Sequence, residues 1–378
     1  MKKILFPLAW LILAGVFAVN PAMCLETGND VQSVPSSDGK SLEDRVRKIE
    51  ESMNHKKDGA ASWFENVQIS GAVEVEAGYS NTDLDDPAED DEKTGDVDLS
   101  AVEVAIDAVI APQVEAHVLF KYEDDDVFLD EGYITLKGPE GCPASLAAGR
   151  MYIPFGTFES SFISDPLTLE LGETNEGAVV LGYRLLDETV NLDLGIFNGK
   201  TEEQGEDDTL SNYVARITVV PMEGFSFGGS YNSNLASADA FSEQVQDDLD
   251  EYVAGWSVFV SVTLMDRLTA NAEYLAAVDE FKAGEIYDKA DTSKRCPEAW
   301  NIEVGYAFMD NLNAALRYGG SHDGDAEHGE FLAETQFGAV MNWDMFEKTS
   351  LALEYMNSAY AGDYQTVDTV TAQLAVEF

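Results

Sequence analysis

Basic side chains are scarce in this sequence. Its 378 residues include 22 lysines and arginines against 71 aspartates and glutamates, which gives a formal net charge of −49 at pH 7. Nucleic acids and anionic lipid headgroups are therefore poor partners, because both would be repelled. Cations, cation-bearing solutes and bridging divalent ions are favoured instead. The chain is still apolar enough to fold, since hydrophobic residues make up 45% of it.

Residues that commonly build active sites are also few. The chain has three cysteines and four histidines. It contains no nucleophile elbow, no histidine triad and no glycine-rich phosphate loop. Two histidines, His322 and His328, lie near each other in an acidic stretch, but their spacing matches no named metal site. The sequence therefore predicts neither an enzyme nor a bound cofactor.

The amino terminus carries a marked apolar run, Ile4–Val19, preceded by Lys2 and Lys3. This run is short for a membrane-spanning helix. A basic start, an apolar centre and small residues before Cys24 are typical of a secretory signal. Residues 1–24 are therefore predicted to be a signal peptide. Lipid attachment at Cys24 is a second possibility, although the residues before it match the preferred pattern poorly.

Residues 25–62 are predicted to form a periplasmic spacer. Val31–Lys40 is polar and serine-rich, as in a flexible linker. The following residues then repeat apolar side chains at alternating spacings of four and three, at Leu42, Val46, Ile49 and Met53. This is the seam of a short coiled coil, which suggests a homotrimer. A single amphipathic helix packed against a barrel rim explains the pattern equally well.

Residues 63–378 follow a period of two. In the last segment, Val370, Ala372, Leu374, Val376 and Phe378 alternate with more polar residues. Such alternation indicates strands with one wet face and one apolar face. The segments run for about 9 to 14 residues and number about sixteen, which matches tilted strands of an outer-membrane barrel. The expected fold is an all-β, transmembrane antiparallel β-barrel facing outer-membrane lipid, with Phe378 suited to recognition by barrel-assembly machinery.

Connection lengths support this fold. Short links, such as Leu186–Thr189 and Met265–Arg267, alternate with longer acidic ones, such as Thr201–Thr209 and Asp279–Arg295. Short periplasmic turns and long outer loops are typical of outer-membrane barrels. The predicted topology puts both termini in the periplasm. It also puts Cys142 and Cys296 on opposite sides of the membrane, which forbids a disulfide between them.

One long connection differs from the others because it is rich in apolar residues. Gly149–Leu181 contains a strand, an insertion with a helical-looking turn, and a second strand. A long apolar loop is unlikely to stay extended in water. We expect Pro154–Glu176 to fold inward and constrict the water-filled lumen that sixteen strands leave.

Alternation also predicts a charge map of the lumen. The inward acids are expected to be Glu74, Glu76, Glu103, Asp107, Glu115, Asp193, Glu273, Glu303, Glu334 and Glu354. The inward bases are fewer: Lys121, Arg150, Arg184, Arg216 and Arg317. This excess of acids predicts a preference for cations, and the absence of a basic ladder argues against a phosphate-selective pore.

The residues expected to line the constriction come from the insertion and from the strands near it. Arginines on the wall would face loop carboxylates and set up a field across the narrowest point. Simple pairing of these arginines with wall carboxylates is an equally good interpretation. The expected constriction residues are Arg150, Tyr152, Glu159, Asp165, Glu170, Glu173, Arg184 and Arg216.

Several motifs resemble a known family. They are Gly149–Gly156 (GRMYIPFG), Phe158–Ser164, Asp165–Glu170, Gly172–Thr174 and Gly195–Gly199. With these motifs the chain resembles the LbtU-type siderophore porins and, more distantly, the phosphate-selective porin group. The resemblance covers Trp63–Phe378. It implies an outer-membrane pore of a Gram-negative bacterium that passes ferric siderophores without an energy-coupling partner.

The sequence thus predicts a passive channel for ferric siderophores or small cationic or polar solutes. A general cation-selective porin is a less specific alternative. A structural protein, trimerised by the coiled coil and anchoring the outer membrane, is another alternative. An outer-membrane enzyme would need a polar constellation that the sequence does not show.

Overall fold

The structure is a computed structural model that describes residues 66–84, 92–123, 126–205, 210–325, 329–360 and 365–378. The predicted signal peptide, the spacer and its coiled coil lie outside these residues. The described chain forms sixteen strands: β1 (Val67–Leu84), β2 (Glu92–Ala111), β3 (Val114–Glu123), β4 (Asp126–Lys137), β5 (Ala144–Tyr152), β6 (Asn175–Leu185), β7 (Val190–Phe197), β8 (Asn212–Met222), β9 (Phe225–Asn232), β10 (Gly255–Leu264), β11 (Leu268–Ala277), β12 (Glu298–Met309), β13 (Leu312–His322), β14 (Thr335–Phe346), β15 (Thr349–Ala359) and β16 (Gln365–Glu377).

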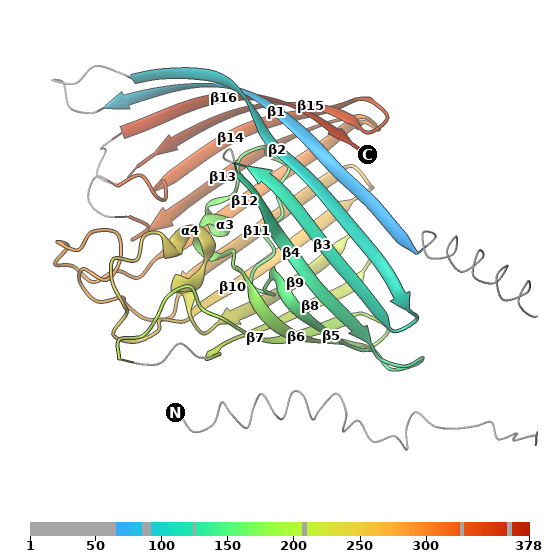
Figure 1. Cartoon of the computed structure of the whole chain (residues 1–378). Helices are drawn as coiled ribbons and strands as arrows, with labels where there is room; N and C mark the ends of the chain where they lie inside the picture. The colour runs from blue at the N-terminus through green and yellow to red at the C-terminus, as the bar shows by residue number, and fades with distance from the viewer. Residues whose placement is uncertain (1–65, 85–91, 124–125, 206–209, 326–328, 361–364) are drawn as a thin grey trace, which may run out of the picture.

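These strands close into one antiparallel barrel (Figure 1). Each strand pairs with its neighbours in the chain, and β1 closes the ring by pairing with β16. The predicted all-β antiparallel barrel of about sixteen strands is therefore confirmed. Among the described residues, no helix has the length and apolar character needed to cross a membrane.

The two faces of each strand differ as the period of two predicts. On β12, Ile302 and Val304 are 47% and 46% exposed, whereas the alternating Glu303 is 2% exposed. On β10, Val258 is exposed and Ser257 is buried. An apolar outer face is what lipid requires, and closure of the sheet pairs the backbone polar groups of neighbouring strands. The acids and amides therefore point into the barrel.

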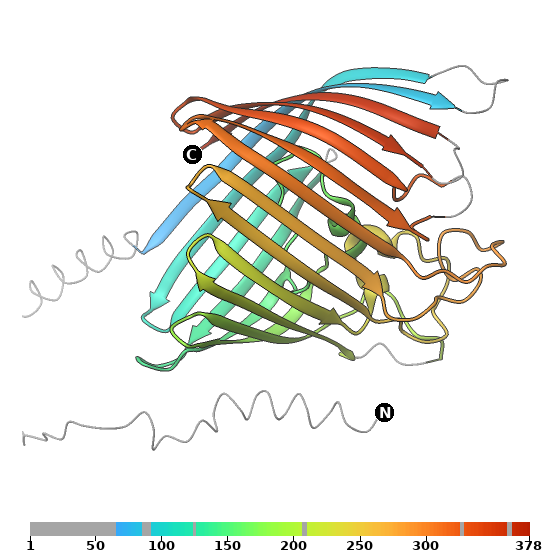
Figure 2. The same cartoon turned by 180° about the vertical axis from the view of Figure 1, so that it is seen from behind.

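The two ends of the barrel differ in their connections. One end, the turn end, has tight links such as 186–189 and 265–267, and β1 begins and β16 ends there (Figure 2). The other end, the loop end, carries the long links. Cys142 lies in the link 138–143 at the turn end, and Cys296 lies in the link 278–297 at the loop end. Both cysteines are free, as the topology requires.

Two local expectations about the strands were wrong. Glu334 was expected on an inward strand face, but it lies just before β14 and is exposed. The strands β1 and β2 are also longer than expected, because their pairing continues from Gly78–Asp96 out to Thr82–Glu92. Acidic side chains at that end tolerate a strand conformation, since the backbone ladder and not the side chains holds the hairpin together.

Three long connections at the loop end pack together into a cap, formed by residues 233–254, 278–297, 323–325 and 329–334. It contains η1 (Leu235–Ser237) and α4 (Asp239–Ser242). Phe241 is fully buried at its centre, 5.6 Å from the Phe281 ring and 5.9 Å from the Phe331 ring. Acidic runs in these links were expected to be solvated loops. In the run Asp247–Glu251 the carboxylates are exposed, but Leu249 is fully buried.

Candidate functional site

The connection between β5 and β6, residues 153–174, is called the β5–β6 segment. It contains α3 (Leu167–Gly172), which packs against α4 of the cap. Four of its apolar side chains are shielded from water. They are buried in the main hydrophobic cluster together with residues of β7, β11 and the cap, and they are Ile153, Phe155, Leu167 and Leu171. The segment and the cap therefore share one hydrophobic core.

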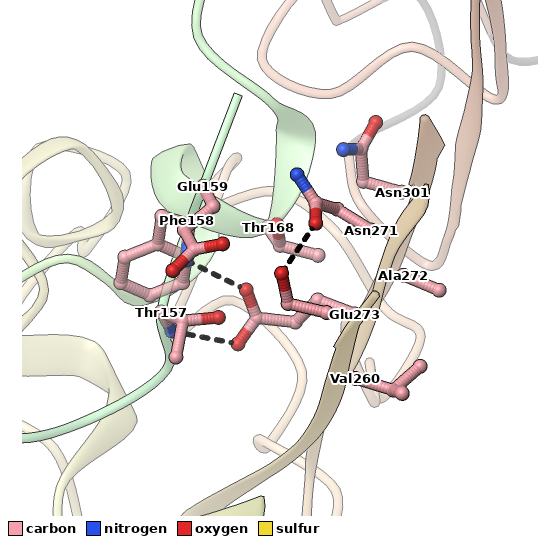
Figure 3. Close-up of a pocket in the computed structure, with 10 residues that line it drawn as sticks. Thr157, Phe158, Glu159, Thr168, Val260, Asn271, Ala272, Glu273 and Asn301 are labelled. Carbon is pink, nitrogen blue, oxygen red and sulfur yellow. Dashed lines mark hydrogen bonds between the residues drawn. The ribbon is translucent and has the colours of Figure 1, made fainter. Parts of the chain in front are cut away.

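A glutamate of β11 holds the start of the segment. The Glu273 carboxylate accepts the backbone N–H of Thr157 at 3.1 Å and that of Phe158 at 2.9 Å (Figure 3). It also accepts the hydroxyl of Ser257 at 2.7 Å. Hydrogen bonds to a charged acceptor are about twice as strong as neutral ones. One buried side chain thus holds two consecutive amides of the segment.

Two further glutamates repeat this arrangement along the segment. Glu303 of β12 accepts the backbone N–H of Ser161 at 3.0 Å and the hydroxyl of Ser160 at 2.8 Å. Glu354 of β15 accepts the backbone N–H of Ile163 at 2.6 Å. The ring order places β11, β12 and β15 well away from β5 and β6 on either side. The segment therefore bonds to strands far around the ring from those that it connects.

An arginine of β13 completes the attachment. Arg317 is fully buried, and its Nε lies 2.9 Å from the Glu303 carboxylate. Its Nη1 donates to the backbone carbonyl of Asp165 at 3.1 Å, and its Nη2 donates to the Ser160 hydroxyl. The guanidinium also stacks on Phe162, 4.2 Å from the ring centroid. Arg317 therefore neutralises Glu303 and binds the segment at the same time.

The cavities on the two sides of the segment differ in size. Between the segment and β10–β12 lies a cavity of about 10 Å³, lined by Thr168, Glu273 and Asn301 among others (Figure 3). This is room for about one water molecule. On the side of β4–β8 lies a cavity of about 460 Å³. Of these two cavities, only the one on the β4–β8 side has room for a solute.

Two arginines and one aspartate line the larger cavity. Asp193 of β7 is buried and lies 2.8 Å from Arg184 Nη1 and 3.5 Å from Arg216 Nη2. Arg216 Nη1 also donates to the backbone carbonyl of Gly156, at 3.2 Å. Two guanidinium groups thus share one carboxylate, which leaves a surplus positive charge on this part of the wall.

Carboxyl groups of the β5–β6 segment carry the opposite charge. Burial, together with the nearby carboxylates of Asp165 and Asp239, raises the pKa of Glu173 to about 7. Burial also raises the pKa of Glu170 and of Asp165, which Arg317 partly offsets at Asp165. These residues lie in the connection, outside the strands. Glu173 lines the larger cavity together with Arg184 and Arg216.

The structure brings part of the predicted site together. Tyr152, Glu173, Arg184 and Arg216 line the larger cavity, whereas Glu159 lines the smaller one. Arg150 is not among the cavity-lining residues, and its Nε donates to the backbone carbonyl of Asp130 at 3.2 Å. The arginines were expected to face carboxylates of the insertion. Arg184 and Arg216 instead pair with Asp193, so the alternative interpretation, pairing on the wall, describes them better.

The residues that hold the segment were not part of the predicted site. Alternation did predict that Glu273, Glu303, Glu354 and Arg317 point inward. Nothing in the sequence shows which inward carboxylate reaches which backbone amide, since the contacts join residues that are more than a hundred positions apart. The bonded amides of Phe158, Ser161 and Ser164 lie three residues apart, which is the period of the repeat along the segment.

The sequence of residues 59–378 matches the family described as Gram-negative porin. The chain belongs to that family. The match covers the whole barrel, so this porin is an outer-membrane channel protein, and its location is the outer membrane of a Gram-negative bacterium. The family and the fold are those of channels.

Curated relatives of this porin are distant. It is 23% identical over 304 residues to a UPF0422 protein of Coxiella burnetii, which covers 76% of this chain and 63% of the relative. It is 22% identical over 369 residues to a UPF0422 protein of Legionella pneumophila strain Lens, which covers 82% of this chain and 66% of the relative. The chain thus spans somewhat under two thirds of the length of these relatives.

Solved porins share the fold. The outer-membrane channel DcaP of Acinetobacter baumannii aligns with a TM-score of 0.58 at 17% identity, covering 82% of this chain and 97% of DcaP. An anion-selective porin from Comamonas acidovorans aligns with a TM-score of 0.58 at 12% identity, and the alignment covers 82% of this chain and 99% of that porin. Salmonella typhi OmpF, in complex with daunomycin, aligns with a TM-score of 0.59 at 11% identity, and the alignment covers 83% of this chain and 98% of OmpF. At such identities the likeness concerns the fold alone.

Proposed function

We propose that this porin is a passive, water-filled channel constricted by the β5–β6 segment, folded into the lumen. The attachment of consecutive segment amides to Glu273, Glu303 and Glu354 is the observation that carries this proposal. These glutamates lie on inward strand faces, so a segment bonded to all of them occupies part of the lumen. Solutes pass between the segment and β4–β8, with the loop end outside and the turn end in the periplasm.

The proposed domain division follows the sequence. Residues 1–24 are the signal peptide, residues 25–62 the periplasmic spacer, and residues 63–378 the barrel. A homotrimer held by the coiled coil belongs to the same proposal. If native mass spectrometry in detergent finds only monomer, the proposed homotrimer is wrong.

The channel is proposed to prefer cations. Inward carboxylates outnumber inward basic groups on β1–β3, where Glu74 and Glu76 face the lumen near Lys121. The surplus positive charge at Arg184 and Arg216 acts locally, because both guanidinium groups lie on one stretch of the wall. A cation that approaches the constriction along β1–β3 therefore meets mostly acids.

We expect cation selectivity to depend on pH near neutrality. Glu173 has a pKa of about 7, so it is mostly ionised at pH 8 and mostly protonated at pH 6. The reversal potential under a KCl gradient should therefore show weaker cation preference at pH 6 than at pH 8. In Glu173→Gln the preference should stay at its low-pH value throughout. If cation preference in this variant still changed between pH 6 and pH 8 as in the wild type, a group other than Glu173 would cause the pH dependence.

The proposed solutes are ferric siderophores or small cationic and polar molecules. The motifs of the β5–β6 segment support siderophore passage, because they resemble LbtU-type porins. Liposomes that contain the porin should take up a ferric siderophore down its gradient without any energy source. Matched liposomes with heat-denatured porin serve as the control. If the liposomes take up potassium and glycine but not the ferric siderophore, siderophore passage is contradicted and the protein is a general cation-selective porin.

A further inference from the structure

The hairpin of β1 and β2 extends beyond its neighbour β3 at the loop end (Figure 1). The pairing of β2 with β1 continues out to Glu92, whereas its pairing with β3 stops at Val102–Tyr122. Residues 92–101 of β2, called the open edge, therefore have a strand on one side only. Among the residues that the structure describes, no strand pairs with the other side.

The open edge is long enough to bind another strand. At about 3.3 Å per residue, residues 92–101 span roughly 30 Å. Unpaired N–H and C=O groups of an edge strand are a ready template for an added strand. Natural edges are often protected by proline or by several lysines. Residues 92–101 contain no proline and one lysine, Lys93, and their other charged side chains are the acids Glu92, Asp96 and Asp98, which repel an acidic strand but attract a basic one.

The two faces of the open edge differ in charge. Asp96 and Asp98 pair with Gly78 and Glu76, so these acids share one face, the same face as the inward Glu76. The opposite face carries Val97 and Leu99, which are 69% and 43% exposed. An incoming strand would therefore place every second side chain beside carboxylates and the others beside apolar groups.

We propose that the open edge is a docking site for an extended polypeptide segment whose side chains alternate between basic and apolar. The backbone adds as a further strand beside β2, its basic side chains face Asp96 and Asp98, and its apolar side chains cover Val97 and Leu99. The open edge of a second copy is a poor occupant, because it would place its own Asp96 and Asp98 beside the same acids. The site lies on the extension of the β1–β2 hairpin at the loop end, and its test does not depend on conduction.

The test uses the full porin refolded in lipid nanodiscs and a short fluorescent peptide of alternating lysine and valine. Its affinity is compared by fluorescence anisotropy with that of an alternating glutamate and valine peptide. It is also compared with the lysine peptide N-methylated at its central residues, which keeps its charge but cannot donate hydrogen bonds. We expect both control peptides to bind at least roughly tenfold more weakly, which corresponds to about 1.4 kcal/mol.

A matched pair of porin variants locates the binding. Asp96→Asn with Asp98→Asn should weaken binding of the lysine peptide by roughly tenfold. Asp344→Asn with Glu347→Gln removes two charges at the turn end and should leave the affinity unchanged. In hydrogen-exchange mass spectrometry, the peptide should protect amides of residues 92–101.

Three results would overturn the proposal. Equal binding of the N-methylated peptide would mean electrostatic adsorption without strand addition. Binding without protection of residues 92–101 would place the peptide elsewhere. In a background with Cys142→Ser and Cys296→Ser, disulfide-linked dimers of Thr94→Cys, formed rapidly without peptide, would show that a second copy occupies the edge.

Discussion

A porin in which Glu273 and Glu354 are both replaced by alanine should conduct about two- to threefold more current per channel, because releasing the constriction opens the lumen that sixteen strands enclose. Each glutamate holds two consecutive amides of the β5–β6 segment. Without these acceptors the amides are free to bond to water. The segment should then leave the wall and fluctuate, and the open-channel current should become noisier.

Glu76→Ala is the matched control for this experiment. Glu76 also faces the lumen, but it accepts hydrogen bonds from Ser100 and Gln373 of the wall. Its removal takes away one lumenal charge without touching the segment, so the conductance should stay close to that of the wild type. An unchanged conductance in the double variant would mean that the shared core with the cap holds the segment without these glutamates.

Arg317→Met should destabilise the folded barrel by about 3–5 kcal/mol, because it leaves Glu303 buried without a countercharge. Arg317 is fully buried, and Glu303 is 2% exposed, so water cannot replace the lost partner. Methionine keeps much of the side-chain volume, which limits the effect of a cavity. Urea-induced unfolding in lipid vesicles, followed by tryptophan fluorescence, measures the change.

Two further variants separate the charge from the packing. The double variant Arg317→Met with Glu303→Gln should recover much of the lost stability, because Glu303 no longer leaves an unpaired charge there. Arg216→Met removes a partly exposed arginine beside Asp193 and should cost about 1 kcal/mol or less. If Arg317→Met costs no more than Arg216→Met, then the buried pair contributes little to the fold.

Alternation and connection lengths were sufficient to predict the barrel. Residues such as Val258 and Ile302 alternate with polar neighbours because one strand face meets lipid and the other meets water. This relation is local, so a single sequence displays it. The strand ends were predicted less well, since the ladder of β1 and β2 continues through acidic residues that would also suit a loop.

The site was predicted only in part. Arg184, Arg216 and Glu173 do line one cavity, because strand alternation and the apolar insertion are both visible in the sequence. The attachment of the segment could not be predicted. It depends on contacts such as Ile163 with Glu354, which the closure of the ring brings together across most of the chain.

The cap explains a further feature that the sequence left open. The apolar residues of the insertion suggested a segment that avoids water, and folding into the lumen was the expected solution. In the structure, Phe155 and Leu171 are buried in a cluster that includes Phe241 of the cap. The segment thus has an apolar side toward the cap and a backbone that bonds to wall glutamates, and both hold it in place.

The central claim is an open, cation-preferring channel constricted by the β5–β6 segment. Its most direct test is the single-channel conductance and reversal potential of the refolded porin in a planar bilayer under a KCl gradient at pH 8. We expect stable open steps and a reversal potential of the sign that cation selectivity requires. A silent bilayer, or a reversal potential of the anion-selective sign, would contradict the claim.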